Sequence, residues 1–130
     1  GDPLRLSVKY LLDVNALMAW GHPSVAGHDR FHLWAKREGF GSLATCAHVE
    51  LGFLRVSMAA YGFSPESAQI VLAGMKRHVG GFVGSAPSPQ LARWARTPGR
   101  TSDAYLIQLA ESAGLRLATF DTSIPDAVRI

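Results

Sequence analysis

Two short apolar runs, one near each end of the chain, each stop at an aspartate. Residues 8–12 lead into Asp13, and residues 115–120 lead into Asp121. Short runs that are mostly apolar on both faces are typical of strands buried in a parallel sheet. The segments between them alternate between helical and strand patterns, which indicates an α/β fold with helices on both faces of the sheet. Because parallel strands all end along one edge, Asp13 and Asp121 are expected to lie at the same edge.

Apolar spacing and capping residues predict the remaining elements. Helices are predicted at residues 15–20, 25–37, 46–61, 65–78 and 102–113, with one or two helical turns at 90–96. Thr45 and Ser64 are the predicted N-caps of the third and fourth helices, and Gly114 is the predicted stop of the last. Further strands are expected at 39–44, 82–83 and, at the sheet edge, 127–130. The 130 residues predict a single domain, with residues 1–3 interpreted as an expression remnant because they lack an initiator Met.

The composition excludes several classes of protein. A hydrophobic content of 48% excludes a disordered chain, and one cysteine excludes a disulfide framework or a Cys-rich zinc module and favours the cytoplasm. The apolar stretch at residues 10–20 is too short to span a bilayer, so no membrane association is expected. The net charge of +3, with arginine as ten of the 13 basic residues, permits an anionic partner. The low charged fraction of 18% suggests that partners cover part of the surface.

Four of the ten acidic residues stand where acids are uncommon. Asp13 and Asp121 end strands, Glu50 lies among apolar residues of a helix, and Asp103 opens a helix. Taken singly, they are also consistent with turn residues, a solvated helix face and a helix-dipole interaction. If the four converge, their mutual repulsion requires cations, and oxygen-only ligands select Mg²⁺ or Mn²⁺ over zinc. Such ions bind phosphate oxygens and activate water, so the reaction indicated is metal-assisted hydrolysis of nucleic acid.

The four acids fall in four short segments whose order along the chain is distinctive. The segments read LLDVNAL, ATC with ELGFLRV, TSDAYL and LATFD, at residues 11–17, 44–56, 101–106 and 117–121. Together they resemble the PIN-domain superfamily, and within it the VapC-like toxins of bacterial toxin–antitoxin pairs. The resemblance covers nearly the whole chain and implies a three-layer α/β/α PIN-like fold with a central, mainly parallel sheet.

The resemblance also implies an activity and the residues that perform it. The expected activity is that of a Mg²⁺- or Mn²⁺-dependent endoribonuclease that cuts structured RNA such as tRNA or rRNA. The positions that match the family's motifs assign catalysis and metal binding to four acids, with two polar residues supporting them: Asp13, Glu50, Asp103 and Asp121, then Asn15 and Thr45.

The partners implied by the resemblance are a cognate VapB-like antitoxin, the RNA substrate and a second copy of the chain. Apolar surface on the first, second and fourth helices is expected to be covered by such partners. Arg93, Arg96 and Arg100 precede Asp103 and are candidate RNA contacts, or else part of a solvated face. Thr122 follows the last acid where many relatives carry a basic residue, which bears on RNA contacts rather than metal binding. The alternative function is a catalytically silent PIN-like module that binds a protein partner.

Overall fold

A five-stranded parallel sheet forms the centre of the protein. The computed structural model describes residues 8–130, so the interpretation of residues 1–3 lies outside the described residues. The strands lie in the order β3-β2-β1-β4-β5, and each pairs in parallel with its neighbours. Their bounds are Tyr10–Leu12 for β1, Leu43–Cys46 for β2, Gly81–Val83 for β3, Arg116–Thr119 for β4 and Val128–Arg129 for β5. The parallel sheet and the edge strand β5 confirm the prediction. The strand expected at 39–44 is instead β2, which begins at Leu43 because residues 40–42 form a 3₁₀ helix.

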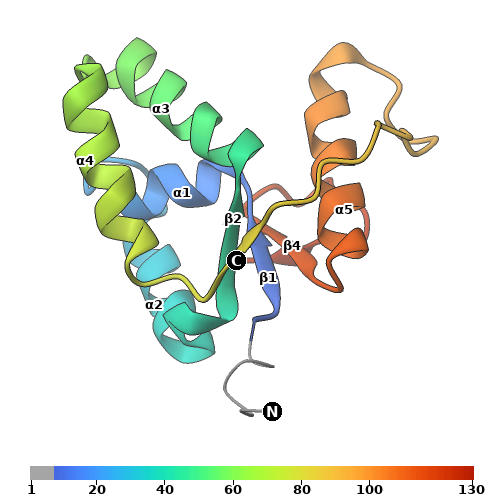
Figure 1. The fold of residues 1–130 in the computed structure, drawn as a ribbon, viewed down its shortest axis with the longest axis horizontal. Helices are drawn as coiled ribbons and strands as arrows, with labels where there is room; N and C mark the ends of the chain where they lie inside the picture. The colour runs from blue at the N-terminus through green and yellow to red at the C-terminus, as the bar shows by residue number, and fades with distance from the viewer. Residues whose placement is uncertain (1–7) are drawn as a thin grey trace.

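Helices cover both faces of this sheet. Figure 1 shows α5 on one side and the other four α-helices on the opposite side. The helices are α1 (Val14–Gly21), α2 (His28–Glu38), α3 (Ala47–Tyr61), α4 (Pro65–Lys76) and α5 (Thr101–Ser112), with short 3₁₀ helices η2 (Phe40–Ser42) and η3 (Pro98–Arg100). The architecture is therefore the expected three-layer α/β/α fold.

The core lies mainly between the sheet and α1–α4. Helix α1 is apolar along most of its length, and its residues 16–20 are all buried. Trp20 stacks on Phe31 of α2 with ring centroids 5.6 Å apart, and Phe53 of α3 is fully buried. Because α1 is buried on most sides, it occupies the middle of its layer. Its first residues lie directly after β1, which fixes the position of Asp13.

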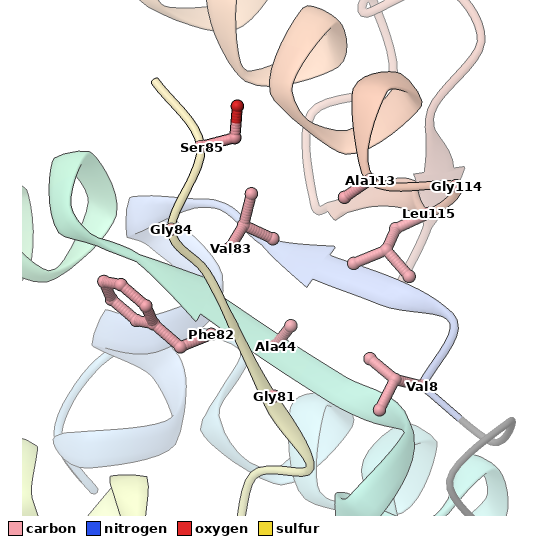
Figure 2. Close-up of a pocket in the computed structure, with 10 residues that line it drawn as sticks. All are labelled: Val8, Ala44, Gly81, Phe82, Val83, Gly84, Ser85, Ala113, Gly114 and Leu115. Carbon is pink, nitrogen blue, oxygen red and sulfur yellow. The ribbon is translucent and has the colours of Figure 1, made fainter. Parts of the chain in front are cut away.

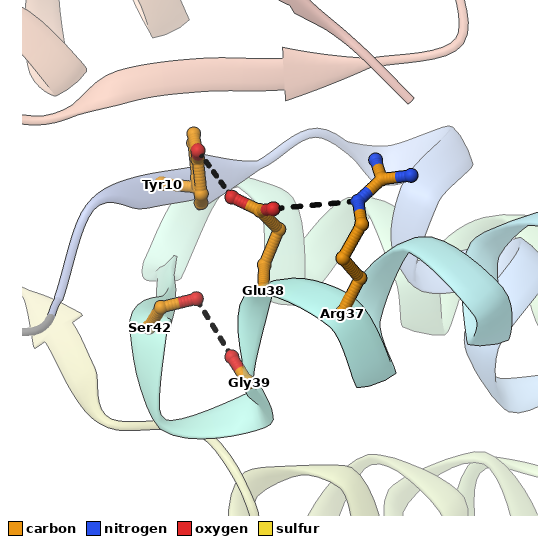
Figure 3. Close-up of polar contacts among 5 residues, drawn as sticks. All are labelled: Tyr10, Arg37, Glu38, Gly39 and Ser42. Atoms are coloured by element: carbon orange, nitrogen blue, oxygen red, sulfur yellow. Dashed lines mark hydrogen bonds and ion pairs between the residues drawn. The ribbon is translucent and has the colours of Figure 1, made fainter.

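Hydrogen bonds tie the opposite end of β1 to α2. The hydroxyl of Tyr10 donates to Oε1 of Glu38 at 2.6 Å, and Nε of Arg37 lies 3.6 Å from Oε2 (Figure 3). The hydrogen bond from Tyr10 lowers the pKa of Glu38, and that same bond raises the pKa of Tyr10. Ser42 donates to the carbonyl of Gly39 at 2.6 Å, which closes the turn into β2. These contacts stabilise the amino end of β1, at the opposite end of the strand from Asp13.

Two local predictions are confirmed and two are wrong. Ser64 caps α4 by accepting from the amide of Ser67, and Gly114 follows α5 with a φ of 72°. Thr45 is not an N-cap, because it lies within β2 and Cys46 occupies the capping position of α3.

Residues 90–96 form no helix, contrary to prediction. The segment before α5 is held by hydrogen bonds to that helix: Tyr105 donates to the carbonyl of Pro87, and Gln108 donates to Ser88 and accepts from the amide of Gln90. Most of residues 84–97 are exposed, so a helix of one or two turns there has no packing surface to stabilise it.

Exposed apolar side chains lie on three of the helices. Leu33 on α2, Leu51 on α3 and Ile70 on α4 are each about 70% exposed. The expectation of apolar surface on the first helix is wrong, because the large apolar side chains of α1 are in the core. Among the described helices, none has the length and apolar character needed to cross a membrane.

Candidate active site

Asp13 lies at the carboxyl end of β1, where it is 6% exposed and caps α1. Its Oδ1 accepts a hydrogen bond from the amide of Ala16 at 2.8 Å, and its Oδ2 accepts one from the hydroxyl of Thr119 on β4. Both carboxylate oxygens are therefore held in fixed directions. Each oxygen retains a further lone pair, because an ionised carboxylate has about four acceptor sites.

Asp121 lies two residues beyond β4 and is joined to Asp13 through Thr119. The amide of Asp121 donates to Oγ1 of Thr119 at 3.0 Å, while the same hydroxyl donates to Asp13. Oδ1 of Asp121 accepts from the amide and the hydroxyl of Ser123, at 2.8 and 2.7 Å. Thr119 and Ser123 were not among the predicted site residues. The available signals were a hydroxyl at the end of a buried strand and an Asp-x-Ser turn pattern.

Asp103 lies in the first turn of α5, and its charge interacts with those of Asp13 and Asp121. Burial raises the pKa of Asp103, and the charge of Asp121 raises it further. Burial likewise raises the pKa of Asp13, and the charges of Asp103 and Asp121 add to this effect. The hydrogen bonds from Ser123, by contrast, lower the pKa of Asp121. Three of the four predicted acids thus lie close enough to influence one another's ionisation.

A small cleft, which we call the acid cleft, brings two of these acids together with polar side chains. Its volume is about 180 Å³, and its polar and charged lining comprises Asp13, Asn15, His48, Ser102, Asp103 and Arg55. The predicted supporting residue Asn15 is therefore adjacent to Asp13 and Asp103. His48 and Arg55 are exposed residues of α3 that lie in the cleft, and neither was among the predicted site residues.

Glu50 has different partners from the three aspartates. Its Oε2 accepts a hydrogen bond from the hydroxyl of Thr45 at 2.6 Å, and its Oε1 lies 3.2 Å from Nζ of Lys76 on α4. Nζ of Lys76 also lies 5.1 Å from the centroid of the Phe82 ring. The predicted supporting residue Thr45 therefore contacts Glu50 directly. Glu50 is not among the residues that line the acid cleft.

The donor chemistry of the three aspartates matches a hard divalent cation. In the part of the chain from residue 8 onward, no three acidic, histidine or cysteine side chains are arranged closely enough to hold a metal ion. The carboxylates of Asp13, Asp103 and Asp121 nevertheless repel one another, and Asp13 is buried. A bound cation would relieve this repulsion, and carboxylate oxygens are the ligands that Mg²⁺ and Mn²⁺ prefer.

The three candidate RNA-contacting arginines are in different environments. Nη2 of Arg100 donates to the carbonyl of Ser123 at 2.8 Å, and its guanidinium lies 4.8 Å from the centroid of the Trp94 ring. Arg100 therefore supports the turn that holds Asp121. Arg93 and Arg96 are exposed and form no ion pair within residues 8–130.

A larger cavity lies away from the acids. It has a volume of about 450 Å³ and opens on the α5 side of the sheet, between β3 and the segment that follows α5 (Figure 2). Among the described residues its walls are mainly small or apolar side chains, and Ser85 is the polar one. The acid cleft, which brings two of the predicted acids together with further polar side chains, is the candidate active site.

Comparison with known proteins identifies relatives over most of the chain. Ribonuclease VapC38 of Mycobacterium tuberculosis (strain ATCC 25618 / H37Rv) is 34% identical over 128 residues, covering 88% of this chain and 86% of that protein. Ribonuclease VapC39, from two strains of the same species, is 32% identical over 130 residues, covering 90% of this chain and 91% of the relative. No family model matches the chain.

Proposed function

The chain belongs to the VapC ribonuclease family of the PIN-domain superfamily, and we propose that it is a Mg²⁺- or Mn²⁺-dependent endoribonuclease toxin. One observation carries the proposal. Asp13, Asp103 and Asp121 come from three separate segments of the chain, and Asp13 and Asp103 line one cleft. Burial raises the pKa of both Asp13 and Asp103, and the charge of Asp121 raises it further. Such mutual destabilisation is expected where acids are arranged for a cation.

The aspartates would hold the ion, and their hydrogen bonds prepare them for this role. When bound, a divalent ion activates water and neutralises phosphate oxygens during hydrolysis. Asp13 is oriented by the amide of Ala16 and the hydroxyl of Thr119, so its free lone pairs have defined directions. Asp121 is kept ionised by Ser123, since hydrogen bonds to a carboxylate favour the charged form. The expected cleavage products carry 5′-phosphate and 3′-hydroxyl ends.

Glu50 completes the proposed set of four acids. Its carboxylate pairs with Lys76, and the exposed fraction of the side chain is 14% for Glu50 and 41% for Lys76. The flexible, partly exposed lysine side chain can turn toward solvent, which would free the carboxylate when a divalent ion competes for it. Thr45 contacts the other carboxylate oxygen and would orient it.

The proposed substrate is a structured RNA such as tRNA or rRNA. The net charge of the chain is +3, which permits an anionic partner. Arg55 lines the acid cleft, and Arg93 and Arg96 are exposed. An exposed arginine in the acid cleft, such as Arg55, is suited to contact the phosphates that flank the cleavage site, and Arg93 and Arg96 are further candidates.

The proposed protein partners are a VapB-like antitoxin that neutralises the toxin and a second copy of the chain. Leu33, Leu51 and Ile70 are large apolar side chains with about 70% exposure, and burial of such surface favours association. A molar mass of twice 14.0 kDa in light scattering supports the homodimer, and a mass of 14.0 kDa at the same concentration contradicts it.

The test is cleavage of purified tRNA by Asp13→Asn and Asp103→Asn variants in Mg²⁺ or Mn²⁺. Each substitution removes one carboxylate charge at nearly constant volume, so we expect at least about a 100-fold loss of rate, equivalent to about 3 kcal/mol. Asp126→Asn is the matched control, because Asp126 is exposed, lies outside the acid cleft and has a positive φ that Asn tolerates. Full activity in both cleft variants would refute the assignment of the aspartates.

A catalytically silent binding module is the second candidate, because Glu50 pairs with Lys76 and the described acids form no compact metal-binding group. Calorimetric titration with Mn²⁺ separates the two. The nuclease must bind Mn²⁺ through Asp13 and Asp103, whereas the silent module need not bind it. Absence of both Mn²⁺ binding and cleavage in the unmodified protein would favour the module.

A further inference from the structure

An apolar pocket lies directly beside the acid cleft. It has a volume of about 320 Å³ and is formed by α1, the loop that follows α1, the C-terminal half of α3 and the residue after β4. We call it the Phe120 pocket, and it is lined by Asn15, Met18, Val25, Ala26, Val56, Ala60, Tyr61 and Phe120. Asn15 lines both this pocket and the acid cleft, so it lies at the border between the two.

Two aromatic side chains of the pocket are held in place by neighbouring groups. The guanidinium of Arg30 lies over the ring of Phe120, 5.0 Å from its centroid. The ring of Tyr61 stacks on His22, with centroids 5.3 Å apart and planes 12° apart. His22 is itself buried, and its Nε2 lies 2.8 Å from Oγ of Ser57. The pocket therefore presents ordered aromatic surface without needing to rearrange.

The polar side chain at the junction of the pocket and the cleft is available for a ligand. Asn15 is exposed, and its amide forms no hydrogen bond with any group of residues 8–130. An amide supplies both donors and an acceptor, which are the groups needed to pair with the edge of a nucleobase. Arg30 and Arg55 lie beside the pocket and in the cleft, and neither forms an ion pair within the same residues.

We propose that the Phe120 pocket binds one unstacked base of the RNA substrate, adjacent to the phosphate at the acid cleft. The inference rests on the proposed ribonuclease function and adds to it a site for base recognition. Single-stranded bases are recognised by stacking on aromatic side chains together with hydrogen bonds to their edges. Phe120 and Tyr61 supply the aromatic surface, Asn15 supplies the edge contact, and the cleft receives the neighbouring phosphate.

A base satisfies this arrangement better than an apolar side chain of a protein partner. Such a side chain would use the apolar wall formed by Met18, Val25 and Val56 but would make no use of the exposed amide of Asn15. It would also make no use of the acid cleft on the other side of Asn15. A base attached to a phosphate uses the apolar wall, the amide and the cleft together.

The test fills the pocket and measures binding of single-stranded RNA. Ala60→Trp places an indole where Ala60 lines the pocket, and Ala59→Trp is the matched control on the same helix, exposed but outside the pocket. The probes are an eight-nucleotide oligouridine and versions in which each base in turn is removed. Affinities are measured by fluorescence anisotropy in Ca²⁺ at one ionic strength, with gel analysis showing that the RNA stays intact.

We expect Ala60→Trp to bind the intact RNA about ten-fold more weakly than Ala59→Trp, the loss typical of one stacked base. We also expect removal of the base at one position to weaken Ala59→Trp about ten-fold but Ala60→Trp hardly at all. This non-additivity would place that base in the pocket. Thermal unfolding of both variants checks that the fold is retained.

Equal affinities of the two tryptophan variants for intact RNA would overturn the inference and leave the pocket to an apolar side chain of a protein partner. Equal losses on base removal in both variants would also overturn it. Cleavage of tRNA by the unmodified protein is measured in parallel. If the unmodified protein cleaves tRNA but the two tryptophan variants bind RNA equally, only the base pocket is refuted. If the expected non-additivity is found but the unmodified protein does not cleave tRNA, only the proposed nuclease activity is refuted.

Discussion

The close packing of α1 against α3 beside the acid cleft can be tested through Gly52. This glycine is buried in α3, and a Cβ atom placed on it would lie 2.6 Å from Cγ2 and 3.4 Å from Cγ1 of Val14. Real Cβ atoms essentially never approach closer than 3.0 Å. Val14 cannot easily rotate away, because a β-branched side chain in a helix has one strongly preferred rotamer. Gly52→Ala therefore forces the two helices apart.

The expected magnitude follows from two opposing effects. Overpacking of this kind costs about 1–3 kcal/mol, whereas replacing a helical glycine by alanine gains roughly 1 kcal/mol. We therefore expect Gly52→Ala to lower the free energy of unfolding by about 1 kcal/mol and the Tm by about 4 °C. Because Val14 and Gly52 both line the acid cleft, tRNA cleavage should fall as well.

The assay is a double-mutant cycle with Val14→Ala, followed by urea denaturation. Without the valine methyl groups the clash is absent, so Gly52→Ala should become stabilising by up to about 1 kcal/mol. The sign of the effect thus reverses between the two backgrounds. If Gly52→Ala has the same effect with and without Val14, contact between these two residues is not the reason for the glycine.

Three further predictions concern the buried polar groups and the helix cap. Thr119→Val should lower the free energy of unfolding by about 1–3 kcal/mol in urea, because it removes the donor to Asp13, whereas Thr119→Ser should retain most of the stability. Burial lowers the pKa of His22, so the folded protein binds fewer protons than the unfolded chain, and stability should fall as the pH drops below about 6.5. His22→Gln should flatten this pH dependence, and an unchanged profile would contradict the assignment. Ser64→Ala should cost about 1 kcal/mol and Ser64→Gly only a few tenths, and equal costs would show that the cap hydroxyl is unimportant.

Local features of the sequence were sufficient to predict most elements of the fold. The apolar run before Asp13 and the one before Asp121 are strands, because short runs that are mostly apolar on both faces are typical of buried parallel strands. Ser64 and Gly114 act at the helix ends as predicted, since capping depends on a few neighbouring residues. The predicted helix at residues 90–96 fails for the converse reason, because helices this short need a packing surface that the local sequence does not provide.

Contacts within the site depended instead on the register and packing of distant elements. In the pairing of β1 with β4, Leu12 lies opposite Ala118, so the next residues along, Asp13 and Thr119, come together across 106 positions of the chain. A shift of register by one residue would turn the Thr119 hydroxyl to the other face of the sheet. No local pattern specifies that register.

The sequence alone determined which residues end strands and helices, and therefore which acids reach the carboxyl edge of a parallel sheet. Only the tertiary structure decided their partners: Thr119 and Ser123 for two aspartates, and Lys76 of a separate helix for Glu50. The physical reason is one of range. Hydrophobic periodicity and capping act over a few residues, whereas hydrogen bonds between side chains require atoms within about 3 Å, a distance that only the packing of whole elements can set.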